Sequence, residues 1–110
     1  MDFTGKNVYL SGPMSGIEDW NAPAFRAARD AAYSMGARCV YDPTDIIGAY
    51  GTHEEYMRAD LHALTRAADP FDALVMLDGW ERSAGATAEV AVARACGIET
   101  VNASELSHEM

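Results

Sequence analysis

Short apolar runs alternate with helix-like segments along this chain of 110 residues, and this alternation restricts the fold more than any other feature. The runs with the length and composition of buried strands are residues 7–12 (NVYLSG), 38–41, 72–77 and 99–101. Strands that alternate with helices predict a parallel sheet covered by helices on both faces. We therefore expect one domain over residues 1–110 with an α/β, flavodoxin- or Rossmann-like three-layer fold and a four- or five-stranded parallel sheet.

Three segments between these strands carry helical signals. Residues 21–35 have Pro23 in the first turn, an apolar stripe and a closing glycine. Thr52 and Glu55 form a capping box for the next helix, whose expected core face is Met57, Leu61, Leu64 and Ala68. The third helix is expected over residues 84–96, and residues 42–51 are expected to form a loop.

Charge and composition exclude several classes of function. The net charge of −9 argues against binding a nucleic-acid polymer, which needs a basic surface, although backbone amides can still hold a small anion. No apolar stretch approaches the roughly 20 residues of a membrane span, and the N-terminus has no signal-peptide pattern. Cys39 and Cys96 lie in apolar segments and are expected to be buried free thiols, which suits the cytoplasm. No cysteine or histidine cluster has metal-ligand spacing.

Ligands of parallel α/β sheets bind beyond the carboxyl ends of the strands, which directs attention to two segments. SGPMSG (11–16) follows the first strand, and its backbone amides can face an anion, although glycine-rich turns here are also common as plain tight turns. DGWERSAGATAE (78–89) follows the third strand. Within it, Ser83 suits a helix cap, and Gly85 permits close approach of a ligand. Glu89 lies among small and apolar residues, which favours a functional carboxylate over a solvated one.

Asp60 and Tyr9 are two further candidate site residues. Asp60 lies four residues after Tyr56 on the second helix, so the two share a face. Taken alone, an aspartate at this position is more often a surface residue, paired with Arg58 or with a neighbouring chain. Tyr9 lies within the first strand, where a tyrosine is usually a core residue whose hydroxyl needs a partner.

Together these segments resemble the nucleoside 2-deoxyribosyltransferase superfamily, which includes the 2'-deoxynucleoside 5'-monophosphate N-glycosidases. The motifs that carry the likeness are YLSGPMSG, Arg58-Ala-Asp60-Leu and GWERSAGATAE. More narrowly, they are similar to a DUF4406-type group of small phage and bacterial proteins. The resemblance implies a small nucleotide as ligand, no metal or organic cofactor, and a homodimer or larger homo-oligomer in which a neighbour completes the pocket. It does not extend to residues 42–51, so contacts to the base are not predicted there.

The resemblance also assigns roles to residues. Glu89 is the implied nucleophile at the anomeric carbon, Asp60 helps the departing base take a proton, and Tyr9 orients Glu89. Breaking an N-glycosidic bond builds positive charge on the sugar, which a carboxylate stabilises or captures. Nucleoside-specific transferases have an aspartate at the position of Ser83, so a serine there favours a 5'-phosphate. The remaining implied contacts to phosphate are Gly85, Ser11, Gly12, Ser15 and Gly16, with Arg82 as a possible addition.

The function expected from this reading is cleavage, by hydrolysis or base transfer, of the N-glycosidic bond of a deoxynucleoside monophosphate. Trp80 either stacks on the base or packs at a subunit interface. One alternative is a non-catalytic protein that binds or sequesters a nucleotide signal. Another is a phosphoribohydrolase of the lysine decarboxylase-like type, although its PGG-GT signature is missing, and a purely structural partner protein is the third. The sequence does not identify the base, the acceptor or the pathway.

Overall fold

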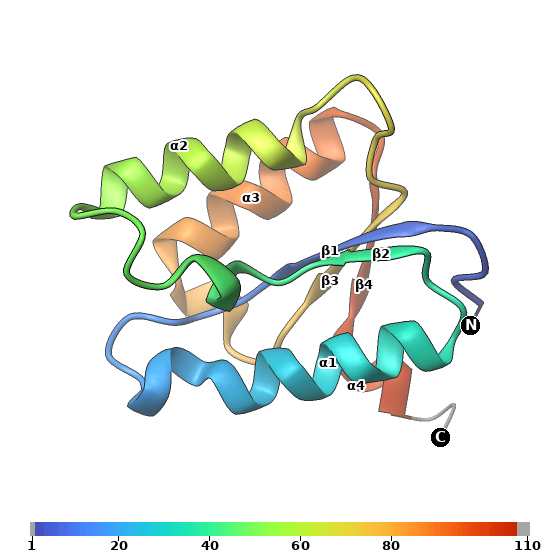
Figure 1. Ribbon diagram of the computed structural model, residues 1–110, viewed down its shortest axis with the longest axis horizontal. Helices are drawn as coiled ribbons and strands as arrows, with labels where there is room; N and C mark the ends of the chain where they lie inside the picture. The colour runs from blue at the N-terminus through green and yellow to red at the C-terminus, as the bar shows by residue number, and fades with distance from the viewer. Residues whose placement is uncertain (1, 108–110) are drawn as a thin grey trace.

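Four parallel strands form the centre of the protein in the order β2-β1-β3-β4 (Figure 1). The computed structural model describes residues 2–107. Within that range the strands are β1 (Asn7–Ser11), β2 (Cys39–Tyr41), β3 (Ala73–Met76) and β4 (Glu99–Asn102). The predicted α/β fold with a parallel sheet is therefore confirmed, with four strands and a flavodoxin-like arrangement.

Helices cover both faces of this sheet. In Figure 1, α2 (His53–Leu64) and α3 (Ala84–Ala95) lie above it, and α1 (Ala22–Ser34) and α4 (Ala103–Ser107) lie below it. Short 3-10 helices occur in the connections at Glu18–Asn21 (η1), Pro43–Ile46 (η2) and Trp80–Arg82 (η3).

Alternation of side chains along β1 divides the interior into two cores. Val8 and Leu10 face α1 and join a cluster with Phe25 and Leu106. Tyr9 and Ser11 face the opposite way, because side chains two residues apart lie on the same side of a strand. Tyr9 belongs to the second core, between the sheet and the pair α2 and α3, whose other buried members are Leu64, Phe71, Leu74, Met76, Val90, Ala93 and Ile98. The side of the sheet that receives Tyr9 and Ser11 is therefore the side covered by α2 and α3.

The strand order creates a crevice between β1 and β3. The chain leaves β1 towards β2 and leaves β3 towards β4, so the two connections diverge from neighbouring strands. Such a switch point, at the carboxyl ends of parallel strands, is where α/β folds bind ligands. At Gly12 the ends of β1 and β3 approach so closely that an added Cβ would lie 2.7 Å from the Cβ of Leu77. Glycine is therefore required for this part of the crevice to form.

Several local expectations were wrong. Helix α2 ends at Leu64, so Ala68 is exposed and lies outside the predicted core face. Helix α4 was not predicted at all. Cys39 is half-buried and Cys96 is exposed, so neither is the buried thiol that its apolar neighbours suggested.

The segment expected to be a plain loop, residues 42–51, contains η2 and is fixed to α1. Asp42 caps η2 by accepting a hydrogen bond from the backbone N–H of Thr44 at 2.9 Å. The same buried carboxylate forms ion pairs with Arg26 at 3.2 Å and Arg29 at 3.4 Å. This end of the segment is therefore held in place beside the carboxyl end of β2.

The described part of the chain has neither a membrane-spanning helix nor a cluster of metal ligands. None of the helices in residues 2–107 combines the length and apolar character that crossing a membrane requires. Over the same residues, no group of three or more His, Cys, Asp or Glu side chains is arranged to hold a metal ion.

Candidate active site

Glu89 lies in the second turn of α3, and its side chain faces the crevice at the end of β1. It is only 6% exposed, yet it lines a cavity of about 590 Å³. Both of its carboxylate oxygens accept a hydrogen bond. The hydroxyl of Ser11 donates to Oε1 at 2.6 Å, and the hydroxyl of Tyr9 donates to Oε2 at 2.9 Å. The carboxylate is thus oriented from β1 while it borders open space.

The sheet explains why these donors meet at one carboxylate. Tyr9 and Ser11 are two residues apart on β1 and point to the same face, which α3 covers. Burial holds the pKa of Tyr9 well above its ordinary value, so its phenol stays protonated and remains a donor. Strand β1 therefore places both donor hydroxyls where they hold the Glu89 carboxylate.

A second carboxyl group, that of Asp60, lies beside the first. Asp60 is on α2, is 8% exposed and lines the same cavity. The hydroxyl of Tyr41 donates a hydrogen bond to its Oδ1 at 2.8 Å. Tyr41 is paired with Tyr9 in the β1–β2 register, and the two rings are stacked, with centroids 4.8 Å apart and planes 8° apart. Two neighbouring strand tyrosines therefore each support one of the two acids.

The two acids interact electrostatically. Burial, together with the nearby charge of Asp60, raises the pKa of Glu89 from 4.5 to about 7 against the opposing effect of the hydrogen bonds from Ser11 and Tyr9. Burial also raises the pKa of Asp60, while hydrogen bonds from Tyr41 and Glu89 lower it. Each carboxyl group thus affects the pKa of the other. Two neighbouring carboxyl groups whose pKa values are both raised by burial are a common arrangement in acid–base catalysis.

One end of the cavity is formed by the beginning of α3. The Ser83 side chain caps this helix by accepting a hydrogen bond from the backbone N–H of Ala86 at 3.1 Å, which leaves the hydroxyl proton free to donate elsewhere. An added Cβ at Gly85 would lie 3.1 Å from Sδ of Met57, so glycine allows α2 and α3 to approach each other here. The exposed N–H groups and the dipole of a helix N-terminus favour an anion. The cavity can thus hold a molecule with a negative group at this end.

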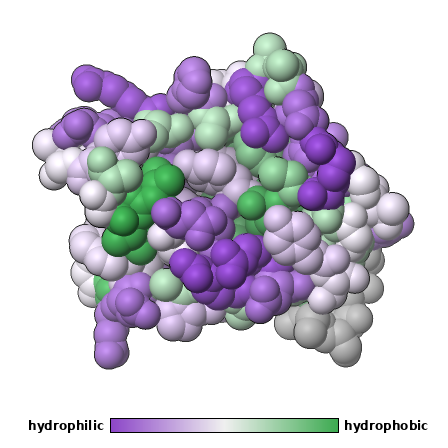
Figure 2. Space-filling view, viewed as in Figure 1, coloured by the Kyte–Doolittle hydropathy of each residue, from purple (hydrophilic) through white to green (hydrophobic). Residues whose placement is uncertain are grey.

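Segments that are distant in sequence form the rest of the cavity wall. Figure 2 shows apolar surface over the segment between β2 and α2, with hydrophilic residues around it. The lining residues beyond those already described are Met14, Trp20, Pro43, Ile47, Gly48, Tyr50, Gly51, Thr52, His53 and Tyr56.

Tyr56 organises this wall. Its hydroxyl accepts hydrogen bonds from the backbone N–H groups of Gly48 at 2.8 Å and Tyr50 at 3.3 Å. The rings of Tyr50 and Tyr56 meet edge to face, with centroids 5.4 Å apart. The segment before α2 is therefore tied to α2 itself, at the mouth of the cavity.

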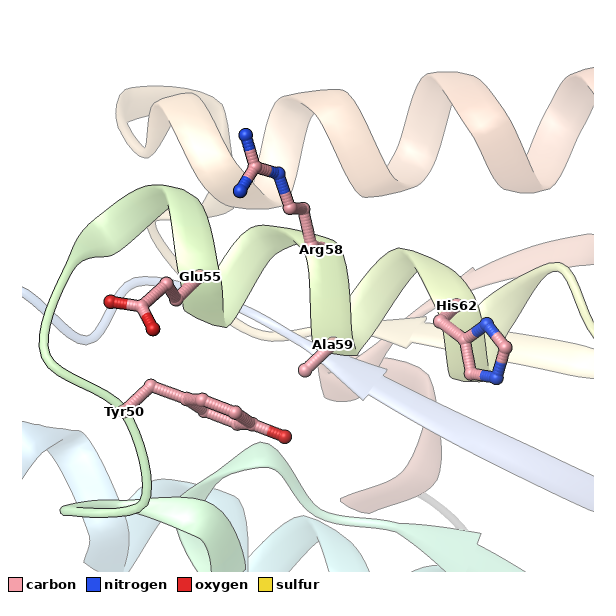
Figure 3. Close-up of a pocket in the computed structure, with 5 residues that line it drawn as sticks. All are labelled: Tyr50, Glu55, Arg58, Ala59 and His62. Atoms are coloured by element: carbon pink, nitrogen blue, oxygen red, sulfur yellow. The ribbon is translucent and has the colours of Figure 1, made fainter.

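A second hollow lies on the outer side of α2 and contains neither of the paired acids. Figure 3 shows the Tyr50 ring alongside α2, on the side of Glu55 and Ala59, with Arg58 pointing away from it. Its remaining lining residue is His62. Tyr50 borders both hollows, so its ring lies between the outer hollow and the cavity that contains Glu89.

The structure brings together most of the side chains singled out from the sequence. The cavity lining includes Glu89, Asp60, Ser83, Gly85, Gly12 and Ser15. Tyr9 is not in the lining, but its hydroxyl donates a hydrogen bond to Glu89. Ser11 differs from its expected place among the phosphate contacts, because its side chain is fully buried and hydrogen-bonded to Glu89. Ser11 therefore supports the Glu89 carboxylate, as Tyr9 does.

Three of the expected contacts lie outside the cavity lining. Gly16 and Arg82 are exposed and do not border the cavity. Trp80 packs against the core that contains Tyr9, with the guanidinium carbon of Arg94 6.0 Å from its ring centre. Trp80 is therefore packed beside this core and is not among the residues that line the cavity.

Sequence reasoning missed Tyr41 and Trp20. Tyr41 was detectable, because it ends β2 and the rule that directs attention to strand ends applies to it equally. No such signal marked Trp20, whose place depends on an unusual turn after β1.

Comparison with known proteins gives one family. A family model described as a domain of unknown function (DUF4406) matches residues 6–102, which include every residue of the cavity described above. No curated protein matches the chain.

Proposed function

The chain belongs to the DUF4406 family, a domain of unknown function, and we propose that it is an N-glycosidase acting on 2'-deoxynucleoside 5'-monophosphates. We further propose that it is a divergent relative of the nucleoside 2-deoxyribosyltransferases. The observation that carries the proposal is Glu89: a buried carboxylate, held at both oxygens, beside a second carboxyl group in a cavity with an anion-binding end.

The proposal gives the two acids different roles. Glu89 must be ionised to attack carbon, and Asp60 must be protonated to assist a leaving base. Because the two acids line the same cavity, a proton that passes from Glu89 to Asp60 produces both states at once, without exchange with solvent. The hydrogen bonds from Tyr9 and Ser11 stabilise the ionised Glu89 that results.

The reaction proceeds in two steps. An Oε atom of Glu89 attacks C1' of the sugar while the bond from C1' to the base nitrogen breaks, and Asp60 gives its proton to the base. Water then attacks C1' of the glycosyl ester and passes a proton to Asp60, which releases 2-deoxyribose 5-phosphate and restores Glu89. If a second base takes the place of water, the same steps give base transfer.

The beginning of α3 supports a 5'-phosphate as the other end of the substrate. The Ser83 hydroxyl keeps a free proton, and the first backbone N–H groups of the helix have no partner within the helix itself. An anion bound there is one helix turn and a half from Glu89 along the same helix, so the phosphate and C1' of one nucleotide are placed by one element. Gly12 and Ser15, from the turn after β1, line the same cavity.

Incubation with a panel of nucleotides tests this proposal. We expect free base from one or more deoxynucleoside monophosphates, measured by liquid chromatography, and much less from the corresponding nucleosides, which lack the phosphate. Ribonucleoside monophosphates in the same panel test the phosphoribohydrolase alternative, which requires them to be preferred. Binding without base release from any member would favour a nucleotide-binding protein and contradict the enzymatic proposal.

A further inference from the structure

We propose that Trp20 is the platform on which the base of the nucleotide stacks, an inference that rests on the function proposed above. Trp20 lines the cavity that contains Glu89 and Asp60, and half of its surface is exposed. It is a member of neither core cluster among the described residues. A large indole that borders a cavity and is not used for packing is available to a ligand.

The backbone around Trp20 supports this assignment. Asp19, Trp20 and Asn21 have φ values of 56°, 54° and 62°, so three successive non-glycine residues adopt the left-handed conformation. This conformation is unfavourable for such residues, and runs of it persist only where the surroundings impose them, often at ligand sites.

Local hydrogen bonds fix the turn. The side-chain amide of Asn21 donates to the carbonyl oxygen of Pro13 at 3.0 Å, and the N–H of Trp20 donates to the carbonyl oxygen of Ile17 at 3.0 Å. The turn is thereby tied back to the segment that follows β1 at the crevice. Because of this turn, the Trp20 indole borders the cavity instead of packing against α1.

The chemistry of the wall indicates the class of ligand group. Besides Trp20, two other exposed apolar side chains, Ile47 and Tyr50, line the cavity, and they come from the segment before α2. The acids and the beginning of α3 provide the polar part. A flat heteroaromatic ring joined to an anionic sugar matches this division, because aromatic side chains stack on any base without reading its hydrogen bonds. We therefore expect Trp20 to contribute affinity for bases in general.

Fluorescence can test this placement, because the chain contains only two tryptophans and Trp80 lies outside the cavity lining. The test protein carries Trp80→Phe, which leaves Trp20 as the emitting residue, and Glu89→Gln, which prevents turnover. Deoxynucleoside monophosphates should quench the emission, whereas 2-deoxyribose 5-phosphate, which has no base, should bind without quenching it. Quenching of equal size by both probes would overturn the assignment, as would the absence of any quenching by the nucleotides.

Calorimetry with matched variants provides the second readout. In the Glu89→Gln protein, Trp20→Leu should weaken nucleotide binding by about tenfold or more, which is the effect of losing one stacked base. It should leave the affinity for 2-deoxyribose 5-phosphate unchanged. Trp20→Phe should bind nucleotide with an intermediate affinity, and Trp80→Phe should match the parent. Unchanged nucleotide affinity in Trp20→Leu, with circular dichroism showing an intact fold, would contradict the inference.

The outcomes separate this inference from the proposed function. Base release by the wild-type protein, combined with full nucleotide affinity in Trp20→Leu, overturns the stacking role alone. Quenching and tight binding without base release overturn the glycosidase proposal and support the stacking role. Failure of every nucleotide to bind overturns both.

Discussion

Glu89→Gln should reduce the release of base from a deoxynucleoside monophosphate by at least about 10³-fold, because removing a catalytic nucleophile has effects of this size or larger. The substitution keeps the shape of the side chain and an oxygen that can accept from Ser11 or Tyr9. It removes the negative charge that attacks C1' and the proton that Glu89 is proposed to pass to Asp60. Binding of the nucleotide should change far less than its turnover.

The measurement is the initial rate of base release at saturating substrate, with nucleotide affinity measured separately by calorimetry. Glu99→Gln is the matched control, because Glu99 is exposed at the amino end of β4, the opposite end of the sheet from the cavity. The control should retain the wild-type rate. A Glu89→Gln protein that releases base as fast as the control would show that this carboxylate takes no part in the reaction.

The same substitution should stabilise the protein in a manner that depends on pH. In the folded protein the pKa of Glu89 is raised from 4.5 to about 7, so the folded state binds the proton more tightly than the unfolded state does. The resulting contribution to stability is complete below pH 4.5 and is lost as the pH rises through about 7. A shift of this size corresponds to up to about 3 kcal/mol. Relative to the wild type, Glu89→Gln should therefore gain free energy of unfolding between pH 5 and pH 8.

Urea unfolding of both proteins at pH 5 and at pH 8 measures this effect. Relative to the wild type, Glu89→Gln should gain more free energy of unfolding at pH 8 than at pH 5. The reason is that at pH 8 the wild type must keep a buried charge at Glu89, whereas Gln carries no charge. Titrating groups remote from Glu89 contribute equally to both proteins and cancel in the difference, whereas Asp60, which interacts with Glu89, contributes to the effect. A difference that is the same at both pH values would show that Glu89 is not held in its protonated form by the fold. Together with the loss of turnover, the expected gain would identify a residue kept for activity at a cost to stability.

The position of Glu89 could be anticipated from the sequence for physical reasons, whereas Asp60 and Tyr9 were assigned to the site by resemblance. The alternation of strands and helices implied a parallel sheet, and the carboxyl ends of its strands had to share one edge. Glu89 was distinctive because its neighbours on the helix are small or apolar, whereas a solvent-exposed helix face normally carries more charged residues. In the structure the Tyr9 hydroxyl lies within hydrogen-bond distance of the Glu89 carboxylate and of the backbone oxygen of Asp60, and both acids line one cavity.

The roles of Ser11 and Tyr41 depended on register, which the sequence pattern did not supply. Ser11 was expected among the phosphate contacts, although the predicted strand 7–12 included it, and its spacing of two from Tyr9 puts it on the same face. Tyr41 became a support for Asp60 only once β2 was paired with β1 so that Tyr41 stood beside Tyr9. The roles of both residues follow once the bounds of β1 and its register with β2 are known.

The wall of the cavity could not be predicted, because it depends on backbone conformations that have no sequence signature. A left-handed turn at three non-glycine residues is too rare to be inferred from composition, so Trp20 was overlooked and Trp80 was considered in its place. Residues 42–51 contain the proline and glycines of a loop, yet Asp42 and Tyr56 fix them through contacts with α1 and α2. Such long-range contacts appear only in the folded chain.

The most direct test of the account is to trap the sugar on Glu89. A nucleotide whose sugar carries fluorine at C2' in the arabino configuration slows both steps, because fluorine destabilises positive charge at C1', and a good leaving group on C1' then lets the ester accumulate. The account predicts an increase in protein mass equal to one fluorinated sugar 5-phosphate, located on Glu89 by peptide mapping and missing from Glu89→Gln. An adduct on another residue, or release of base from this analogue with no adduct at any time, would contradict it.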